Sequence, residues 1–403
     1  MIEATTGIDL ELSRVAVRSI SKERDSHIEV SLLTTDADGV VADPEIDLVV
    51  EVIGGIEPAR SLIQAALKAG KPVVTANKEL LANVGAELYA TADAAGVDLL
   101  FEAAAAGAIP IVRPLRESLL GEDITRVMGI LNGTTNYILT RMTEDGASYA
   151  EALAEAQRLG YAERDPTADV EGYDAGAKAA IMASLAFGAN VVAGDVFHEG
   201  ISAISQADIS FARRLGYEIK LLGIAEIFGP SLGDREVGVR VHPAMVPVAH
   251  PLASVRDSFN AVFVEGPSAG ELMFYGRGAG GRPSASAVLG DLIDAAINLT
   301  RGTHRPVPTG RRARIRPIDD LESAYYLNVE VDDAPGVLAA VAGVFGQHGV
   351  SIRSMEQEGL GTGARIAFIT HLALERNLRS TLHDLRQLSV VTGIHSVLRV
   401  VGE

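Results

Sequence analysis

Short apolar segments alternate with longer amphipathic ones through the first 140 residues. Segments rich in β-branched residues predict strands, and segments with helical apolar periodicity predict helices. Strands separated by helices form parallel sheets with right-handed crossovers, and ligands bind at the carboxyl ends of such strands. We therefore expect an α/β fold with a doubly wound, Rossmann-like parallel sheet. The predicted strands cover 13–20, 28–34, 47–53, 71–77, 97–104 and 124–131, and the predicted helices cover 57–70, 78–96 and 109–120.

The pattern changes after about residue 145, which predicts a second domain of α+β type. Helices are expected over 148–160 and 174–189, with an irregular acidic stretch between them. Strand candidates follow at 236–246 and 261–266. A glycine-rich turn at 276–286 then opens a last helix, which we expect to return to the first domain.

The last hundred residues predict a linker and a third domain. Residues 303–323 are rich in proline and arginine without periodicity, which favours a linker over a nucleic-acid patch in so acidic a chain. Residues 324–403 predict the order β-α-β-β-α-β, which is that of the ferredoxin-like fold. The first two domains are then expected at 1–131 and 132–302.

Composition excludes several classes of chemistry and partner. The chain has 35 Lys+Arg against 53 Asp+Glu, a formal net charge of −18, which argues against general binding to nucleic acid or membranes. Its 403 residues contain no cysteine, which excludes disulfides, thiolate metal sites and cysteine nucleophiles. The nine histidines show no metal-ligand spacing. Because we find neither a signal-peptide layout nor a long apolar run, we expect a cytoplasmic protein.

Two lysines stand where they could take part in catalysis. Lys78 follows a predicted strand and opens a helix, so it is either a solvated terminal lysine or one that faces a ligand. Lys178 lies four residues after Asp174 on one helix face, among small and apolar residues. That pair is either an ordinary intrahelical ion pair or a partly buried, tuned general acid or base. The residues alone leave both choices open.

Three turns have sequences suited to ligand binding, and each also has a purely structural explanation. NGTTNYI (132–138) can simply cap a helix, because Asn and Thr are good N-caps. GRGAGG (276–281) lets backbone approach a ligand closely, but such turns are common. In DDAPGVL (332–338) the amino end of a helix could hold a carboxylate.

Taken together, these motifs resemble homoserine dehydrogenases with a carboxy-terminal ACT domain. The resemblance runs from about residue 13 to the carboxyl end, and 159–181 is its most specific part. It implies NAD(P)-dependent interconversion of L-homoserine and L-aspartate 4-semialdehyde, in the biosynthesis of threonine, methionine and isoleucine. The segments that carry it are VEVIGG (50–55), VVTANK (73–78), FEAAAAGAIPIVRPL (101–115), GILNGTTNYIL (129–139), LGYAERDPTADVEGYDAGAKAAI (159–181), MFYGRGAGGRPSASAV (273–288), DDAPGVL (332–338) and VSIRSMEQEG (350–359).

The resemblance implies roles for individual residues. Lys178 would donate a proton to the nascent alkoxide, with Asp174 as its catalytic partner, and Lys78 would contact both cofactor and substrate. Glu163 would bind the substrate amino group, and Asp169 would also bind substrate. Reduction of an aldehyde by hydride needs one acid and no thiol, so the absence of cysteine agrees with this chemistry. The implied cofactor-binding residues are Gly54, Thr75, Asn77, Lys78, Gly278 and Gly280.

A monovalent cation, Na⁺ or K⁺, is also implied by the resemblance. Carbonyl oxygens without several carboxylates suit such an ion. The backbone carbonyls that match the family's cation site are those of Glu102, Ala105, Gly107 and Ile109.

The resemblance further implies regulation and assembly. Threonine is the expected feedback effector, bound near Asp333, Pro335 and Gly336, and the chain is expected to form a dimer or tetramer. The cofactor is NADP or NAD. Arg18 and Ser19 stand near the end of the strand that usually decides between the two.

One part of the family's pattern is missing. The family opens with a strand and a GxGxxG turn leading into the first helix, whereas 13–20 resembles its second strand. The lost βα unit, roughly 30 residues, would include the helix amino end that binds the pyrophosphate. We interpret this as a start codon placed too late rather than as a decaying gene, because every downstream catalytic residue is present. On this interpretation the 403-residue form is inactive or poorly folded.

Two other functions are compatible with parts of the sequence. An inactive, truncated paralogue that binds an amino acid through its ACT domain would explain the missing turn, but not the intact Glu163, Asp174 and Lys178. Another NAD(P)-linked amino-acid dehydrogenase of the same plan would explain the fold, but not the whole motif at 159–181.

Overall fold

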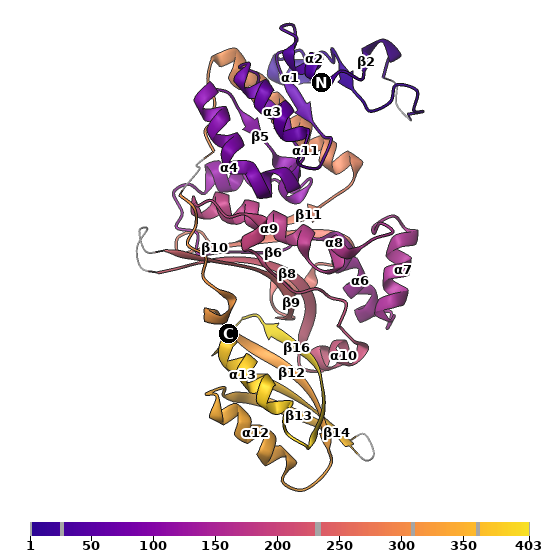
Figure 1. The fold of residues 1–403 in the computed structure, drawn as a ribbon, viewed down its shortest axis with the longest axis vertical. Coiled ribbons are helices and arrows are strands. Elements are labelled where there is room, and N and C mark those ends of the chain that lie inside the picture. The colour runs from indigo at the N-terminus through magenta and orange to yellow at the C-terminus, as the bar shows by residue number, and fades with distance from the viewer. Residues whose placement is uncertain (1, 25–27, 230–234, 308–310, 360–362, 403) are drawn as a thin grey trace. The chain divides into compact units, whose positions relative to one another are not determined.

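A computed structural model describes residues 2–24, 28–229, 235–307, 311–359 and 363–402 (Figure 1). The chain forms two compact units, each assembled from separate stretches of sequence. The first unit comprises 1–121, 184–194 and 279–312, and the second comprises 122–183, 195–278 and 313–403.

The first unit contains two separate parallel sheets. β1 (Val15–Ala16) pairs with β2 (Leu33–Thr34), while β3 (Val49–Glu51), β4 (Val73–Thr75) and β5 (Leu99–Leu100) form a three-stranded sheet. The parallel arrangement confirms the α/β prediction. The strands are shorter than predicted.

Two predicted strands of this unit are partly helical. Residues Val30–Leu32 form the 3-10 turn η1, and α5 (Glu102–Ala106) replaces the end of the strand predicted at 97–104. α11 (Gly281–Arg301) packs on the three-stranded sheet, where Ala295 meets Val74 and Leu100 in an apolar cluster. The other helical elements are α1 (Ile2–Thr6), α2 (Ala37–Ala42), α3 (Ala59–Lys68), α4 (Lys78–Ala95), the π-helical turn η2 (Pro114–Ser118) and η3 (Ala193–Asp195).

The second unit is built on a long antiparallel sheet. Its strands run in the order β11-β10-β6-β8-β9, and their inward faces supply an apolar core that includes Ile224 and Phe263. The bounds are β6 (Arg126–Ile130), β8 (Tyr217–Phe228), β9 (Glu236–Pro247), β10 (Phe259–Gly266) and β11 (Gly270–Arg277). The sequence analysis found β9 and β10, but it did not anticipate β8 or β11. The helices and short elements here are α6 (Gly133–Glu144), α7 (Tyr149–Arg158), α8 (Thr167–Val170), α9 (Tyr173–Phe187), β7 (Phe197–His198), α10 (Gln206–Arg214) and η4 (Pro251–Ser254).

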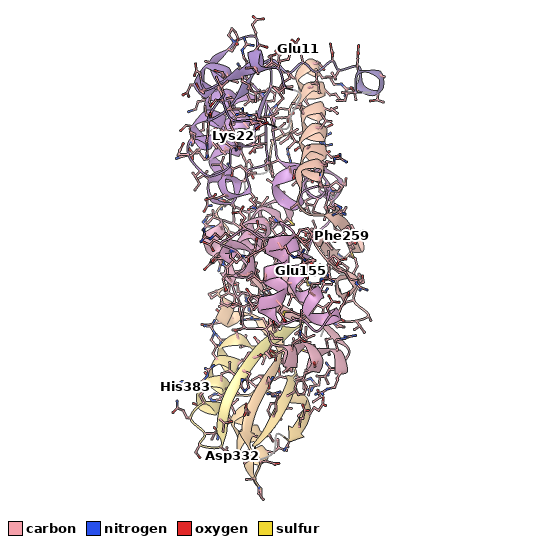
Figure 2. The ribbon with its side chains drawn as sticks, turned by 90° about the vertical axis from the view of Figure 1, so that its right-hand side faces the viewer. Glu11, Lys22, Glu155, Phe259, Asp332 and His383 are labelled. Atoms are coloured by element: carbon pink, nitrogen blue, oxygen red, sulfur yellow. The ribbon has the colours of Figure 1, made fainter. Side chains whose placement is uncertain are left out.

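The carboxyl-terminal part of this unit has the predicted β-α-β-β-α-β order. α12 and α13 cover one face of a sheet ordered β16-β12-β14-β13, as Figure 1 shows in orange and yellow. Asp332, which ends β12, and His383 of α13 are labelled in Figure 2. The elements are η5 (Ile318–Asp320), β12 (Glu322–Asp332), α12 (Val337–Gln347), β13 (Ile352–Gly359), β14 (Gly363–Thr370), β15 (Ala373–Leu374), α13 (Glu375–Leu385) and β16 (Val391–Val400).

This ferredoxin-like sheet continues the long sheet of the same unit. β16 pairs in parallel with β9, with Arg399 opposite Ala244. A second connection comes from Asp208 of α10, which is buried and accepts hydrogen bonds from Asn328 at 3.2 Å and Ser396 at 2.6 Å. The strand pairing and the Asp208 hydrogen bonds thus connect β12 and β16 to the rest of the unit. Among the helices whose residues are described, none is long and apolar enough to span a membrane.

Candidate active site

Lys178 and Asp174 form a buried ion pair on α9. The Lys178 Nζ lies 2.7 Å from the Asp174 Oδ2, and the two side chains are 10% and 7% exposed. Nζ also donates to the backbone carbonyl of Leu131, at 2.7 Å. Because removing charges from water is costly unless they are well paired, this geometry holds the ammonium in one place. The pair is therefore both intrahelical and buried.

Asn132 brings a second carboxylate to this pair. Its Nδ2 donates to Asp174 Oδ2 at 3.0 Å and to Asp169 Oδ1 at 2.7 Å. Its Oδ1 accepts from the backbone N–H of Thr135 at 2.9 Å and so caps α6. The NGTTNYI turn thus caps a helix and also gathers acidic side chains. Sequence analysis identified the cap but missed the second contact.

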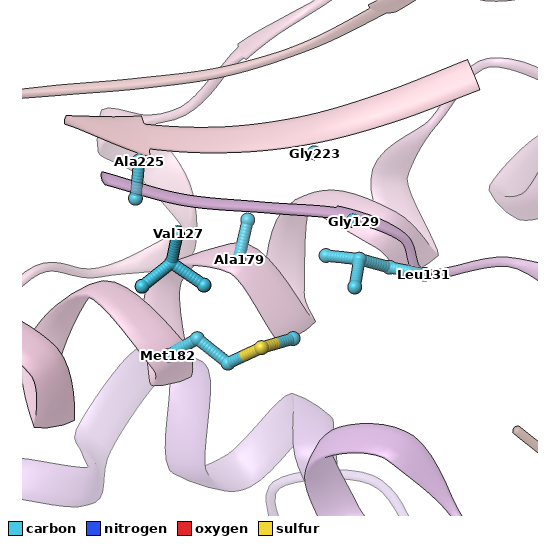
Figure 3. A pocket seen from close by; sticks show the side chains of 7 residues that line it. All are labelled: Val127, Gly129, Leu131, Ala179, Met182, Gly223 and Ala225. Carbon is cyan, nitrogen blue, oxygen red and sulfur yellow. The ribbon is translucent and has the colours of Figure 1, made fainter. Parts of the chain in front are cut away.

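Leu131 is one of the residues that line a small apolar cavity between β6, β8 and α9 (Figure 3). A Cβ on Gly129 would lie 2.7 Å from Leu131 Cδ2, and one on Gly223 would lie 2.6 Å from Leu131 Cδ1. Both positions therefore require glycine to leave room for the leucine side chain. Since the Leu131 carbonyl accepts from Lys178, these two glycines help to place the ammonium.

Glu163 lies in the irregular stretch before α8 and is exposed. Its backbone carbonyl accepts from Gln157 Nε2 at 3.0 Å, which fixes the course of the chain there. The side chain of Asp165, two residues on, accepts from Thr167, and these hydrogen bonds lower the pKa of the Asp165 carboxyl. The structure thus joins Asp169 to the Asp174 cluster and leaves Glu163 at the surface. A substrate-binding role for Glu163 stays a prediction.

A second polar group lies in the first unit, at the carboxyl ends of β3 and β4. Glu51 is buried, and its carboxylate accepts from Ile53 N at 2.7 Å, Gly54 N at 3.1 Å and Thr75 Oγ1 at 2.6 Å. Asn77 continues the network, because its N–H donates to Thr75 Oγ1 at 3.0 Å. This is the edge of a parallel sheet where ligands bind. The family resemblance implies Gly54, Thr75 and Asn77 as cofactor-binding residues but not Glu51, for which the one signal in the sequence is a carboxylate at the end of an apolar strand.

Lys78 opens α4, directly after this network. It is exposed, and Asn77 caps the helix by accepting from Leu80 N at 3.1 Å. The Asn77 Nδ2 also donates to the Gly55 carbonyl at 2.7 Å, so the turn after β3 is tied to the start of α4. Gly54 and Gly55 both have positive φ, which favours glycine. The arrangement places the backbone of the Gly54–Gly55 turn and the side chain of Lys78 at the carboxyl end of the sheet.

The segment with the four expected cation-binding carbonyls includes α5 and the turn after it. Gly107 ends α5 with φ 61° and ψ −113°, which turns the chain sharply. The Glu102 carboxylate is used elsewhere, because it accepts from the N–H groups of Ile111, Val112 and Arg113 at 2.6, 2.7 and 3.1 Å. Burial raises the pKa of the Glu102 carboxyl, although these backbone hydrogen bonds oppose the rise. Within the described residues, no cluster of three His, Cys, Asp or Glu side chains could hold a metal ion.

Gly278 and Gly280 of the GRGAGG turn lie in crowded or strained positions. A Cβ on Gly278 would lie 2.1 Å from the amide of Asn260, a buried residue of β10. Gly280 has φ 120° and is the N-cap residue of α11. Both features explain the glycines structurally, and the structure leaves their cofactor role a prediction.

The DDAPGVL turn of the ferredoxin-like domain is open to solvent. Asp333, Pro335 and Gly336 are all exposed, and Gly336 opens α12 with φ 90°. The turn thus presents the amino end of α12 at the surface.

Family models match almost the whole chain. Residues 2–102 match the NAD binding domain of homoserine dehydrogenase, residues 110–293 match homoserine dehydrogenase itself, and residues 325–390 match the ACT domain.

Full-length relatives give the same result. The homoserine dehydrogenase of Corynebacterium glutamicum is 53% identical over 395 residues, covering 98% of this chain and 88% of the relative, and that of Mycobacterium tuberculosis is 50% identical over 408 residues, covering 100% and 92%. The crystal structure of a homoserine dehydrogenase from Thiobacillus denitrificans superposes with a TM-score of 0.91 at 40% identity, covering 99% of this chain and 92% of that one. The chain belongs to the homoserine dehydrogenase family, NAD(P)-linked oxidoreductases, and carries a carboxy-terminal ACT domain.

Proposed function

We propose that the chain interconverts L-homoserine and L-aspartate 4-semialdehyde with Lys178 as the proton donor. The observation that carries this role is the buried Lys178 ammonium, held by Asp174 Oδ2 and the Leu131 carbonyl. An ammonium has three N–H donors, so these two hydrogen bonds leave one for the substrate oxygen. The bound nicotinamide cofactor supplies or accepts the hydride.

Side chains of the protein would stabilise the charge that develops on the substrate oxygen and the charge of the substrate's ammonium group. When the aldehyde of aspartate 4-semialdehyde is reduced, negative charge develops on its oxygen, and Lys178 would stabilise that charge and then protonate the oxygen. Asp174 would orient the ammonium. Asp169 and Glu163 would bind the substrate's own ammonium group, since carboxylates are the natural partners of a cation.

The cofactor would bind at the ends of β3 and β4. Glu51, Thr75 and Asn77 order the backbone of the turn around Gly54, and Lys78 supplies positive charge to a site that binds a pyrophosphate. NADP is favoured over NAD on two grounds. Arg18 adds a further positive charge, and an archaeal homoserine dehydrogenase 30% identical to this chain was crystallised in complex with NADPH. That structure covers 65% of this chain, with a TM-score of 0.55.

We propose that a further parallel strand, followed by a GxGxxG turn, joins the two sheets of the first unit. In the part of the chain that the structure describes, β1 and β2 pair with one another alone, and the separate sheet ends at β3. The apolar side chains of β3 and the turn after it are exposed, with Val50 at 40%, Val52 at 67% and Ile53 at 42%. An exposed apolar strand edge is a poor end for a sheet, and a strand inserted there would cover it. The segment would also supply the helix amino end that binds the pyrophosphate.

A monovalent cation would bind the carbonyls of Glu102, Ala105, Gly107 and Ile109. Support comes from the chemistry of the donors, which are hard oxygens without net charge. The Glu102 carboxylate is already satisfied by three backbone N–H groups, so it adds no competing site for a divalent ion.

Threonine would act as a feedback effector at the exposed turn of Asp333, Pro335 and Gly336. The amino end of α12 offers N–H donors and a positive dipole to the amino acid's carboxylate. ACT domains usually pair between subunits, so we also propose a homodimer or homotetramer and a cytoplasmic enzyme.

Homoserine-dependent reduction of NAD(P)⁺, followed by absorbance, tests the proposed function. The 403-residue chain should be compared with a fusion in which a β-strand, a GxGxxG turn and a helix precede residue 1. We expect turnover from the fusion and little from the chain alone. Turnover by neither form, together with threonine binding in calorimetry, would instead favour an ACT-domain amino-acid-binding protein. Equal turnover by both forms would rule out the proposed additional strand.

A further inference from the structure

A short stretch of the second unit lies between the ACT domain and the helices that carry the acidic cluster. We call Phe197–Ser202 the connector. It begins with β7, which pairs in parallel with β9, so that Phe197 lies opposite Arg240 and His198 opposite Val241. Side chains of the connector contact β16 of the ACT domain and α9, and its backbone contacts α8.

Arg399 of β16 links the ACT domain to the connector through contacts with two of its side chains. The Arg399 Nη1 donates to Glu199 Oε2 at 2.6 Å, and its guanidinium lies 5.3 Å from the centre of the Phe197 ring. Its Nε and Nη2 donate to the two carboxylate oxygens of Glu375, at 3.1 and 2.8 Å. The Arg399 side chain is only 7% exposed. A buried guanidinium with two carboxylate partners has a nearly fixed position.

The connector in turn supports the first turn of α9. The ring of His198 lies 4.9 Å from that of Tyr173, and a Cβ on Gly176 would lie 2.0 Å from His198 Nε2. Gly176 is therefore in direct contact with the imidazole, two residues after Asp174 and two before Lys178. Displacement of His198 must move this turn or open a gap beneath it, because packed interiors leave little free space.

The connector also supports α8, which carries Asp169. The N–H of Ile201 donates to the carbonyl of Val170 at 2.9 Å, and Ser202 Oγ donates to Glu171 Oε1 at 2.9 Å. A Cβ on Gly200 would lie 2.5 Å from the Val170 carbonyl oxygen, so the two backbones are in close contact. Both helices that supply carboxylates to the site thus contact the same six residues.

We propose that Arg399 is a positioning residue for the Asp174–Lys178 pair and acts through Glu199 and His198. A continuous set of close contacts runs from β16 to the turn of α9 between the two residues of the pair. The same contacts give the ACT domain a route by which a shift of β16 alters the proton donor's position. This proposal rests on the proposed role of Lys178 as that donor.

The test uses Glu199→Gln in the form of the protein that oxidises homoserine. This substitution removes the charge that meets Arg399, and it leaves the Arg399–Glu375 pair intact. Glu330→Gln is the matched control, because Glu330 pairs with His395 at 2.7 Å within the ACT domain and has a similar exposure, 34% against 41% for Glu199. Arg399→Lys, which keeps the charge and loses the two-pronged pairing with Glu375, is the second variant.

We expect kcat of Glu199→Gln to fall about 3- to 10-fold, with an unchanged KM for NADP⁺ and an unchanged urea midpoint. Amide hydrogen exchange at Gly176 and Ile201 should be about 5-fold faster, the range expected when one coupling contact is lost. Arg399→Lys, which loses the pairing that fixes the guanidinium, should lower kcat by at least as much, and Glu330→Gln should behave as wild type. A purely structural role would lower the urea midpoint without this selective change in kcat.

The proposal is overturned if Glu199→Gln retains wild-type kcat and exchange, or if Glu330→Gln changes both to the same extent. Hydrogen exchange does not depend on turnover. If the wild-type protein itself fails to oxidise homoserine, the proposed function fails, while exchange at Gly176 and Ile201 still shows whether the connector links β16 to α9.

Discussion

Lys178 donates a hydrogen bond to the carbonyl of Leu131 at 2.7 Å, although the two residues lie 47 positions apart in sequence. Leu131 is the last residue before the NGTTNYI turn, and Lys178 lies on α9. The ammonium of the candidate proton donor is therefore held by two partners, a carboxylate of its own helix and the backbone carbonyl of the residue that follows β6. Changes at the turn should for this reason appear as changes in catalysis.

Asn132→Ser should lower turnover about 10-fold with little change in the free energy of unfolding. Serine still caps α6, but it cannot reach Asp169 and Asp174 together as the asparagine amide does. Loss of one such bond is worth about 1.5 kcal/mol, or roughly a factor of ten. Steady-state kinetics and urea unfolding measure the two effects. The control is Asn83→Ser on the exposed face of α4, which should match wild type in both; an equal loss of activity in the control would contradict the assignment.

Gly223→Ala should destabilise the protein by about 1–3 kcal/mol and also reduce turnover. The new Cβ would lie 2.6 Å from Leu131 Cδ1, so the leucine and the carbonyl that holds Lys178 must shift. Gly343→Ala is the control, because Gly343 is an exposed residue in the middle of α12 and a Cβ there would have no neighbouring atom within 4 Å. That change should be neutral or stabilising by about 0.5–1 kcal/mol. Urea unfolding compares the two, and equal stability of both variants would show that the Leu131 cavity tolerates a methyl group.

The sequence was sufficient to predict the layers of the fold but not the lengths of its strands. Alternating periodicity predicted the parallel pairing of β1 to β5 and the β-α-β-β-α-β order of the ACT domain correctly. The strand predicted at 124–131 as part of the parallel sheet was wrong in its partners, because β6 pairs antiparallel with β8 and β10. β-Branched residues at 28–34 also predicted a full strand, yet η1 occupies Val30–Leu32 and only Leu33–Thr34 pair with β1. A strand is stabilised by its neighbours, and among the described residues β2 has one neighbouring strand, so local propensity could not decide its length.

The acidic cluster could be predicted only in part for a similar reason. Spacing along one helix placed Asp174 beside Lys178. Contacts of Lys178 with Leu131, and of Asn132 with Asp169, depend on how β6 packs against α9, and no local pattern carries that information. Glu51 was missed because a single carboxylate after apolar residues is as typical of a solvated strand end as of a buried network.

Glu51→Gln should raise the KM for NADP⁺ about 10-fold. The carboxylate accepts from three donors around Gly54 and Thr75, and an amide would turn one of its groups from an acceptor into a donor facing N–H or O–H groups. Loss of this hydrogen bond would destabilise the turn after β3 by about 1–1.5 kcal/mol. This free energy corresponds to a roughly tenfold lower affinity for NADP⁺. Steady-state kinetics with varied NADP⁺ makes the measurement. Glu57→Gln, at an exposed carboxylate nearby, is the control, and a similar rise in its KM would argue against a specific role for Glu51.

Lys220 should make stability rise with pH above neutrality. It lines a polar cavity beside Glu218 and Arg256, and burial lowers its pKa to about 8. The unfolded lysine keeps its ordinary value near 10.4, so between these values the unfolded state binds more protons and folding becomes more favourable as pH rises. The cost of burying the charged form is fully present below pH 8 and is relieved on approaching pH 10.4.

The stability of the wild type relative to Lys220→Met should accordingly increase by about 2 kcal/mol between pH 7.5 and 9.5. Urea unfolding at both pH values measures it, and the difference between the two proteins cancels the titration of other groups. A constant difference across this range would mean that the Lys220 ammonium, which donates to the Val255 carbonyl at 2.6 Å, titrates as it does in water.

The central claim is that Lys178 delivers the proton, and the kcat of Lys178→Ala in homoserine oxidation tests it most directly. The loss of a positioned acid or base should lower kcat by about 100-fold or more, while the affinity for NADP⁺, measured by calorimetry on the same preparation, should be largely retained. A Lys178→Ala enzyme that keeps at least half of the wild-type kcat would contradict the account.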